Sequence, residues 1–257
     1  MINNLFIGKN SFICKSIYQS IRGKYISHKE VDKIDFNNFK NIFLLSSPVI
    51  YKKKKIKNFL FEKKILKRIS SQRLIFFSTS KVYPNLINCD EKIRPCPQSF
   101  YADNKLGVER IFKKEIEKIL ILRLSNIFEI KNQNKNTFLG LMHNNFFKKQ
   151  KIEFDISTNS IRDFLSIKSL ITIIKKIEKK EIFGTFNVGS QKGYKIKDII
   201  KFYFGEKLIS SKKIIEKKKI KSQTLCIKKI KKLIDLSNYN FHNETKLQLK
   251  KCKKYFS

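Results

Sequence analysis

The sequence lacks the features that would place it in a membrane, among disulfide-stapled secreted proteins or among zinc proteins. No apolar run approaches the roughly 20 residues that a helix needs to span a bilayer. The N-terminal residues 1–7 start directly as a strand pattern without a charged leader. The five cysteines are odd in number and show no metal-ligand pairing, so we expect reduced thiols and no metal site. These absences together predict a cytoplasmic protein.

Acidic residues and arginine are scarce, whereas lysine is abundant. The chain has 57 Lys and Arg against 21 Asp and Glu, a formal net charge of +36, and only seven of the basic residues are arginine. Proteins that read phosphates or bases usually use the planar guanidinium of arginine, and the basic residues here are spread over the whole chain. We favour a biased composition that attracts anions and binds nucleic acid only non-specifically. A dedicated nucleic-acid-binding protein is the alternative.

A hydrophobic core is well supplied. The 257 residues are 41% hydrophobic and include 23 Phe, enough for one large domain or two small ones. Buried-strand patterns alternate with helical ones. Strands are expected within residues 4–8, 24–28, 41–48, 73–80, 119–128 and 183–188, and helices within residues 57–70, 100–112, 165–177 and 195–204. The inward side chains expected on the 57–70 helix are Phe59, Leu60, Ile65 and Ile69.

Tyr101 and Lys105 form a Tyr-x-x-x-Lys pattern in the helical stretch 100–112. Residues four apart on a helix are neighbours on one face. A free phenol titrates near pH ~10, and a nearby ammonium lowers its pKa, which suits it to proton exchange with a substrate hydroxyl or carbonyl near neutral pH. Alone the pattern is weak evidence, because a lysine-rich chain produces it by chance.

Small hydroxyl residues follow two of the expected strands. The stretch 73–80 ends in Ser78, Thr79 and Ser80, and the stretch 41–48 ends in Ser46 and Ser47 before a proline. Parallel strands of an α/β sheet deliver such residues to the carboxyl edge, where these folds bind their ligands. We therefore expect these hydroxyls to lie at a binding edge.

With Ile161-Arg-Asp-Phe164 and Gly184-Thr-Phe-Asn-Val-Gly189, these motifs follow the order and spacing of the extended short-chain dehydrogenase/reductase family, the nucleotide-sugar epimerases, dehydratases and reductases. The chain resembles this family over nearly its whole length. The resemblance implies an α/β fold, a doubly wound parallel (Rossmann) sheet with a small C-terminal substrate-binding lobe. It implies a dinucleotide-binding domain of residues 1–128 with a return segment 162–189, and a substrate lobe of residues 129–161 and 190–257.

The resemblance also implies catalytic roles. Tyr101 would exchange the proton on a sugar oxygen, Thr79 would orient that oxygen, and Lys105 would support the nicotinamide ribose and lower the pKa of Tyr101. The neighbours of Thr79 are hydroxyl residues too, so an assignment one residue away stays open. Family dehydratases follow this position with Asp-Glu, whereas this chain has Ser80-Lys81, which argues against dehydration. Lys81 is either an additional acid or base or, as we favour, a solvated surface lysine.

Four residues are assigned to the substrate by the same resemblance. They are Ser80, Lys81, Asn126 and Arg162. Asn126 matches a position that faces the nucleotide sugar in relatives, and capping of the strand end is its alternative role. Arg162 is expected to contact a substrate phosphate or, alternatively, to pair with Asp163 as a structural link.

The cofactor motif departs from the family pattern. Where the family has Gly-x-x-Gly-x-x-Gly, this chain has Gly8, Ser11 and Cys14. The Ser11 hydroxyl is suited to bond a phosphate, and Cys14 is small enough to pack on the strand. The residues assigned to the cofactor are Gly8, Ser11, Phe12, Ile13, Ser46, Ser47 and Lys105. Enzymes specific for NAD usually carry an acid at the end of the second strand, and Ser27-His28-Lys29 stands there, which slightly favours NADP over NAD.

The resemblance thus predicts an NAD(P)-dependent reductase or epimerase that acts on a nucleotide sugar in surface polysaccharide biosynthesis. Relatives are often homodimers that associate through the helix corresponding to the one that carries Tyr101, and a homodimer is expected here on that ground. A non-catalytic member of the same fold is the alternative, because two of the three glycines are missing. An RNA-binding protein on this fold ranks third.

Overall fold

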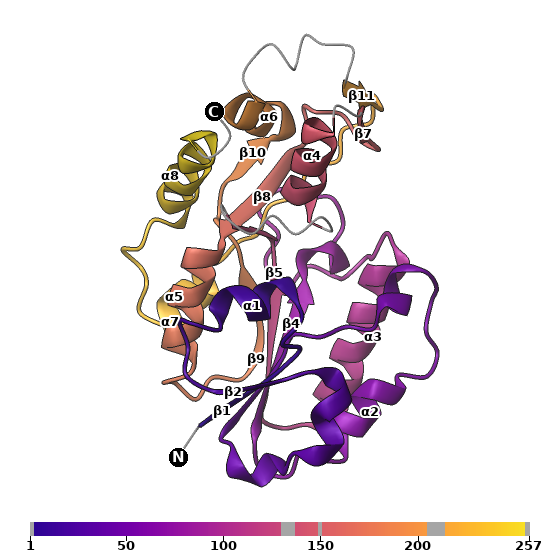
Figure 1. Cartoon of the computed structure of the whole chain (residues 1–257), viewed down its shortest axis with the longest axis vertical. Coiled ribbons are helices and arrows are strands. Elements are labelled where there is room, and N and C mark those ends of the chain that lie inside the picture. Colours follow the sequence, from indigo (N-terminus) through magenta and orange to yellow (C-terminus); the bar gives the residue numbers. More distant parts are fainter. Residues whose placement is uncertain (1–2, 130–136, 149–150, 205–213, 255–257) are drawn as a thin grey trace. The chain divides into compact units, whose positions relative to one another are not determined.

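The computed structural model describes residues 3–129, 137–148, 151–204 and 214–254 (Figure 1). The chain divides into two compact units. Unit 1 comprises residues 1–84, 91–124 and 171–187, and unit 2 comprises residues 85–90, 125–170 and 188–257. Each unit is described by itself below.

A six-stranded sheet with the strand order β2-β1-β3-β4-β5-β9 forms the centre of unit 1. Its strands are β1 (Asn4–Ile7), β2 (Lys24–Ile26), β3 (Asn41–Leu44), β4 (Arg73–Thr79), β5 (Ile119–Leu124) and β9 (Gly184–Val188). The pairs from β2 to β5 are all parallel. The predicted doubly wound parallel sheet is therefore confirmed. The strand order reverses at β1, so the carboxyl ends of β1 and β3 flank the switch point where such sheets bind ligands.

Helices cover both faces of this sheet in unit 1. Because side chains alternate along a strand, Leu5 and Ile7 of β1 face the helices α2 (Leu60–Leu66) and α3 (Phe100–Glu115), with which they share one buried cluster. Phe6 points to the other face and stacks on Phe43 at a centroid distance of 4.5 Å. The short helix α1 (Phe12–Ile17) lies on that second face (Figure 1).

In unit 1 one connection is unusually short and one expected side-chain orientation is wrong. The link between β2 and β3 contains only the 3-10 turns η1 (His28–Lys33) and η2 (Phe36–Asn38) and no α-helix, so this part of the fold is short. The inward orientation expected for Leu60 is wrong, because its side chain is 70% exposed. Glu62 and Ile65 take the inner face of α2, and a residue two positions before Glu62 lies about 200° around the helix.

Unit 2 contains two small sheets and most of the remaining helices. Strands β10 (Gly193–Lys195), β8 (Ile161–Ser166) and β6 (Asn126–Phe128) form one sheet in that order, and β7 (Ile152–Phe154) pairs with β11 (Ile214–Glu216). The other elements are α4 (Phe138–Phe147), α6 (Ile196–Phe204), α7 (Lys228–Leu233) and α8 (Phe241–Lys254). Helix α5 (Ile167–Ile177), whose residues 171–177 belong to unit 1, starts two residues later than predicted, because β8 continues to Ser166.

Within the described ranges, no helix is long and apolar enough to cross a membrane. The same ranges contain no group of three or more His, Cys, Asp or Glu residues arranged to hold a metal ion. Among the residues with described side chains, Cys14, Cys89, Cys96 and Cys226 form no disulfide, and Cys252 lies outside those residues.

Candidate active site

Helix α3 fixes the Tyr-x-x-x-Lys pair against the sheet of unit 1. The helix begins after Ser99, whose side chain accepts the Ala102 N–H at 3.3 Å. Lys105 is only 3% exposed, and its Nζ donates to the Phe77 carbonyl on β4 at 2.6 Å. The ammonium also lies 4.5 Å above the Phe76 ring, a cation–π contact. The lysine is thus anchored on β4 two residues before Thr79.

Tyr101 does not have the lowered pKa that its spacing to Lys105 predicts. Its side chain is partly buried, and burial raises the pKa of the phenol to about 12. Burial also lowers the pKa of Lys105 to about 8. The predicted lowering of the Tyr101 pKa is wrong for this structure, because burial raises it and no contribution from Lys105 offsets that burial.

Thr79 is the last residue of β4 and caps the 3-10 turn η4 (Ser80–Val82), where its hydroxyl accepts the Lys81 N–H at 3.3 Å. The Ser78 hydroxyl points elsewhere and donates to Glu109 at 2.5 Å. Ser80 is buried and Lys81 is exposed. Among the three neighbouring hydroxyl residues, Thr79 is the one at the end of β4. The exposure of Lys81 agrees with its interpretation as a solvated surface lysine.

The turn after β1 has a backbone geometry suited to a phosphate. Gly8 has a φ of 119°, and a Cβ at this position would lie 2.8 Å from the Ser46 nitrogen after β3. The Ser11 side chain caps α1 by accepting the Cys14 N–H at 3.3 Å. Phe12 and Ile13 are the first two residues of α1, positions whose N–H groups have no partner within a helix. Such N–H groups bind phosphates.

The serines after β3 lie at the same switch point. The Ser46 hydroxyl oxygen is buried and has no hydrogen-bond partner among the described residues, and Ser47 is partly buried. Cys14 is fully buried where the family has its third glycine. Gly8 keeps the positive φ of the turn although Ser11 and Cys14 replace the other two glycines. An unpartnered Ser46 hydroxyl beside this turn fits a bound dinucleotide.

An acid near the end of β2 was missed by sequence reasoning. Glu30, on η1, accepts the Ser27 N–H at 2.8 Å and pairs with Lys9 Nζ at 2.9 Å. Hydrogen bonds from Ser27 and Lys9 hold the pKa of this carboxyl at about 2. The Ser-x-x-Glu capping pattern in the sequence could have revealed it.

A hollow of about 430 Å³ opens beside the turn that follows β1. It is lined by Lys9, Asn10, Lys15, Tyr18 and Tyr25.

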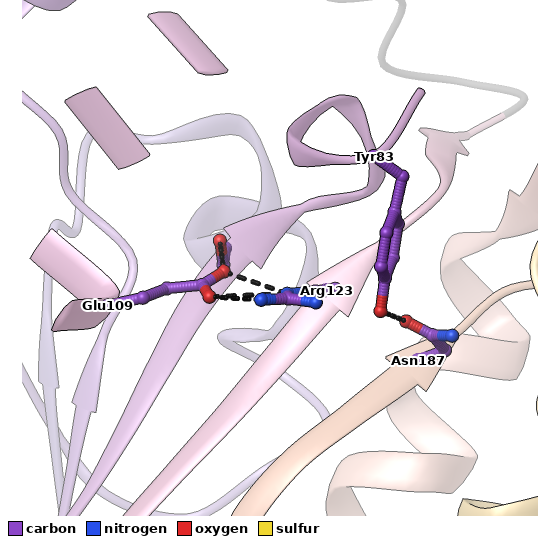
Figure 2. Close-up of polar contacts among 5 residues, drawn as sticks. Tyr83, Glu109, Arg123 and Asn187 are labelled. Atoms are coloured by element: carbon purple, nitrogen blue, oxygen red, sulfur yellow. Dashed lines mark hydrogen bonds and ion pairs between the residues drawn. The ribbon is translucent and has the colours of Figure 1, made fainter. Parts of the chain in front are cut away.

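A buried polar network that joins α3 to β5 was missed as well (Figure 2). Arg123 of β5 donates to Glu109 of α3, with its Nη2 atom 2.6 Å from Oε2, and both side chains are nearly inaccessible. Its guanidinium lies 4.7 Å from the centroid of the Tyr83 ring, and the Tyr83 hydroxyl donates to Asn187 Oδ1 at 2.9 Å. The sequence signal was an arginine inside an apolar strand, because a buried charge requires a partner.

Asn126 and Arg162, the remaining substrate candidates, belong to unit 2. The Asn126 amide donates to the Asp163 carbonyl at 2.8 Å, and Arg162 reaches Asn85 Oδ1 at 3.4 Å. The alternative pairing of Arg162 with Asp163 is wrong. The buried Asp163 carboxylate instead accepts the N–H and the hydroxyl of Ser190, both at 2.8 Å, and the Leu225 N–H at 3.2 Å.

Comparison with known proteins identifies the group to which this arrangement belongs. The model of the NAD dependent epimerase/dehydratase family matches residues 55–189, more than half of the chain. The chain belongs to this family. The predicted resemblance to extended short-chain dehydrogenases/reductases, a group of nucleotide-sugar epimerases and dehydratases, is confirmed. No curated protein matches the sequence.

Solved structures of family members share the fold across the chain. A UDP-glucuronic acid 4-epimerase from Bacillus cereus, solved with UDP-glucuronic acid and NAD, is 18% identical with a TM-score of 0.75, covering 99% of this chain and 100% of that one. The dTDP-glucose 4,6-dehydratase of Bacillus anthracis, solved with NAD, is 16% identical with a TM-score of 0.77, covering 100% and 96%. A UDP-N-acetylglucosamine 4-epimerase from Bacillus cereus is 17% identical with a TM-score of 0.74, covering 99% and 96%.

Proposed function

We propose that the protein is an NAD-dependent enzyme that epimerises or reduces a nucleotide-linked sugar. The observation that carries the proposal is the anchoring of Lys105 on the Phe77 carbonyl, which fastens the helix of Tyr101 to the strand that ends in Thr79. Family membership and the nucleotide-sugar enzymes among the structural relatives support the substrate class.

In this proposal, the chain's own residues handle the proton and the orientation of the sugar. Tyr101 exchanges a proton with the oxygen on the reacting sugar carbon, and the Thr79 hydroxyl hydrogen-bonds the same oxygen. Lys105 holds the nicotinamide ribose beside Tyr101. The nicotinamide, when bound, supplies or accepts the hydride. Gly8, Phe12 and Ile13 hold the pyrophosphate through backbone groups, with Ser11 closing the helix end and Ser46 and Ser47 along the cofactor.

Dehydration is disfavoured by the residues after Thr79. A dehydratase of this family needs an acid and a base there to remove water, and this chain offers a buried serine and an exposed lysine at Ser80 and Lys81. Epimerisation and reduction need only the proton exchange at Tyr101 and the hydride. We assign Ser80, Lys81, Asn126 and Arg162 to the substrate on the family pattern.

The preferred dinucleotide in this proposal is NAD. Sequence reasoning slightly favoured NADP from the basic residues after β2, but the ionised Glu30 carboxylate belongs to the same segment. A carboxylate hydrogen-bonds a ribose hydroxyl and repels the extra phosphate of NADP. The NAD bound in two of the relatives agrees with this assignment.

The decisive experiment substitutes Tyr101 with Phe. The variant removes only the hydroxyl, so NAD affinity by calorimetry is expected to stay unchanged while turnover of nucleotide sugars falls below detection. Tyr239→Phe, a hydroxyl deletion in unit 2, is the matched control and should keep activity. A fully active Tyr101→Phe enzyme would overturn the mechanism. Absence of NAD binding in the folded wild-type protein would favour the non-catalytic alternative.

A further inference from the structure

Three titratable side chains of unit 1 are buried together at the α2–α3 side of the sheet. Tyr51, in the turn η3 (Val49–Lys52), is 2% exposed, Glu62 of α2 is 1% exposed, and Lys105 of α3 is 3% exposed. Charged side chains are rarely buried so completely unless they are paired. The proposed mechanism uses Lys105 but gives neither Glu62 nor Tyr51 a role.

Close packing of two elements against α3 creates this arrangement. A Cβ on Gly107 would lie 2.6 Å from the Phe59 ring, so glycine permits the residue before α2 to pack directly on α3. Asn104, the neighbour of Lys105, donates to the carbonyls of Tyr51 and Lys54 at 3.1 and 2.8 Å. Helices α2 and α3 lie side by side in Figure 1. Both segments are thus held beside the buried lysine.

Two polar atoms of this group, unlike the Lys105 ammonium, lack a hydrogen-bond partner within the described part of the chain. Glu62 Oε2 and the Tyr51 hydroxyl oxygen are both buried, and neither has a well-formed hydrogen bond among the described residues. Such orphaned groups require an explanation. The two side chains nevertheless interact electrostatically. Glu62 raises the pKa of the Tyr51 hydroxyl, and Tyr51 lowers the pKa of the Glu62 carboxyl.

The charges that act on Lys105 come from two elements. Glu62 of α2 and Glu109 of α3 both oppose the burial that lowers the Lys105 pKa. Glu109 is already held by Arg123 and Ser78. Burial raises the pKa of the Glu62 carboxyl, and the Tyr51 hydroxyl and the Lys105 ammonium act in the opposite direction. From β4, the bonded Phe77 carbonyl and the Phe76 ring complete the surroundings of the ammonium.

We propose that Glu62 is a positioning residue for the Tyr101–Lys105 pair and acts as the buried counter-charge that keeps Lys105 protonated. The interaction with the Tyr51 hydroxyl favours the charged form of the Glu62 carboxylate. No bond is made or broken in this role, since Glu62 changes only the free energy of the charge on Lys105. The consequence for turnover rests on the proposed function, whereas the charge pair itself is testable without any ligand.

The test follows folding stability with pH in the full-length protein without ligand. Since the Lys105 pKa is lower in the folded than in the unfolded state, its contribution to stability is complete above the unfolded pKa and is lost as pH falls through about 8. In Glu62→Gln the stability gain with rising pH should begin about one pH unit lower, because an opposite charge is missing. In Lys105→Met this gain disappears, and adding Glu62→Gln should then leave the alkaline profile unchanged.

Two further variants keep the test decisive. Glu115→Gln removes an exposed carboxylate of α3 and should reproduce the wild-type profile. Tyr51→Phe should shift the profile in the same direction as Glu62→Gln but by less. Superimposable profiles of Glu62→Gln and wild type between about pH 7 and pH 10 would overturn the proposal.

The enzyme loaded with substrate gives a separate readout. Glu62→Gln should move the alkaline limb of the pH profile of kcat to lower pH while KM for the nucleotide sugar stays within about twofold. A protein without turnover would count against the proposed function, and the stability profiles would still decide the role of Glu62. An unshifted kcat profile together with a shifted stability profile would confine Glu62 to folding and overturn its role in positioning.

Discussion

At the scale of single residues, Gly8 combines two constraints that only glycine meets. Its φ of 119° is in the left-handed range, and a Cβ would come within 2.8 Å of the Ser46 nitrogen. Gly8→Ala should therefore lower the free energy of unfolding by about 1–3 kcal/mol and abolish NAD binding, measured by urea denaturation and calorimetry.

Gly184 provides the matched control for that substitution. Its φ is 99°, yet among the described residues, apart from Gly184 and its two chain neighbours, no atom lies within 4 Å of the position that a Cβ would take. Gly184→Ala should show the backbone cost alone and retain NAD binding. Equal effects of the two substitutions on NAD binding would contradict a special role for the close approach between Gly8 and Ser46.

Thr79 can be distinguished from its hydroxyl neighbours by single substitutions. In the proposed mechanism, Thr79→Val keeps the shape and removes the hydrogen bond to the sugar oxygen, so kcat should fall about 10²- to 10³-fold, as it does when one preorganised donor is lost. Ser78→Ala should mainly reduce stability, because its hydroxyl bonds Glu109. If Ser80→Ala lowered kcat and Thr79→Val did not, the catalytic hydroxyl would lie one residue later.

At the scale of elements, the ion pair between Glu109 of α3 and Arg123 of β5 links the helix of Tyr101 to the sheet (Figure 2). Removal of one partner leaves an uncompensated buried charge, so Arg123→Met should destabilise the protein by about 3–5 kcal/mol. The double variant with Glu109→Leu should be more stable than Arg123→Met alone. Additive losses in urea denaturation would contradict a coupled pair.

In the proposed function, the turn η1 carries the choice between NAD and NADP. Glu30→Gln removes the carboxylate that bonds Ser27 and pairs with Lys9. Lys9 is then free to attract the extra phosphate, so the affinity ratio of NADPH to NADH should rise at least tenfold in calorimetry. Glu178→Gln, a substitution outside this segment, is the control. An unchanged ratio would remove Glu30 from cofactor recognition.

The elements were easier to predict from the sequence than the contacts between them. The buried strands and the Tyr-x-x-x-Lys helix follow from apolar periodicity, and the doubly wound sheet follows from their order. The orientation of Leu60 was predicted wrongly because the inner face of α2 depends on where the helix begins. It begins after Phe59, and this start places Glu62 and Ile65 on the inner face. Arg123 was missed because its partner, Glu109, lies on another element, whereas Glu30 had a local signal in Ser27 three residues before it. Long-range pairing leaves only a faint signal in a single sequence.

At the scale of the whole molecule, the net charge of +36 opposes compact folding. Like charges repel over a Debye length of about 10 Å at 0.1 M salt and about 3 Å at 1 M. Among the described residues, all ion pairs except Glu109–Arg123 are at least partly exposed and contribute little. The melting temperature should therefore rise with sodium chloride, and a fall would show that exposed ion pairs outweigh the repulsion.

The net positive charge also predicts how the protein binds nucleic acid. Lysine carries a point charge and lacks the planar guanidinium with which arginine recognises bases. The basic residues are also distributed over the whole sequence and not concentrated in one segment. Binding to single-stranded RNA should weaken steeply with salt, since counterion release drives it, and unrelated sequences of equal length should bind within about twofold of each other. Fluorescence anisotropy with several RNAs at two salt concentrations measures both properties. Selective binding that persists at high salt would instead favour a dedicated RNA-binding function, because shape and base contacts do not depend on released counterions.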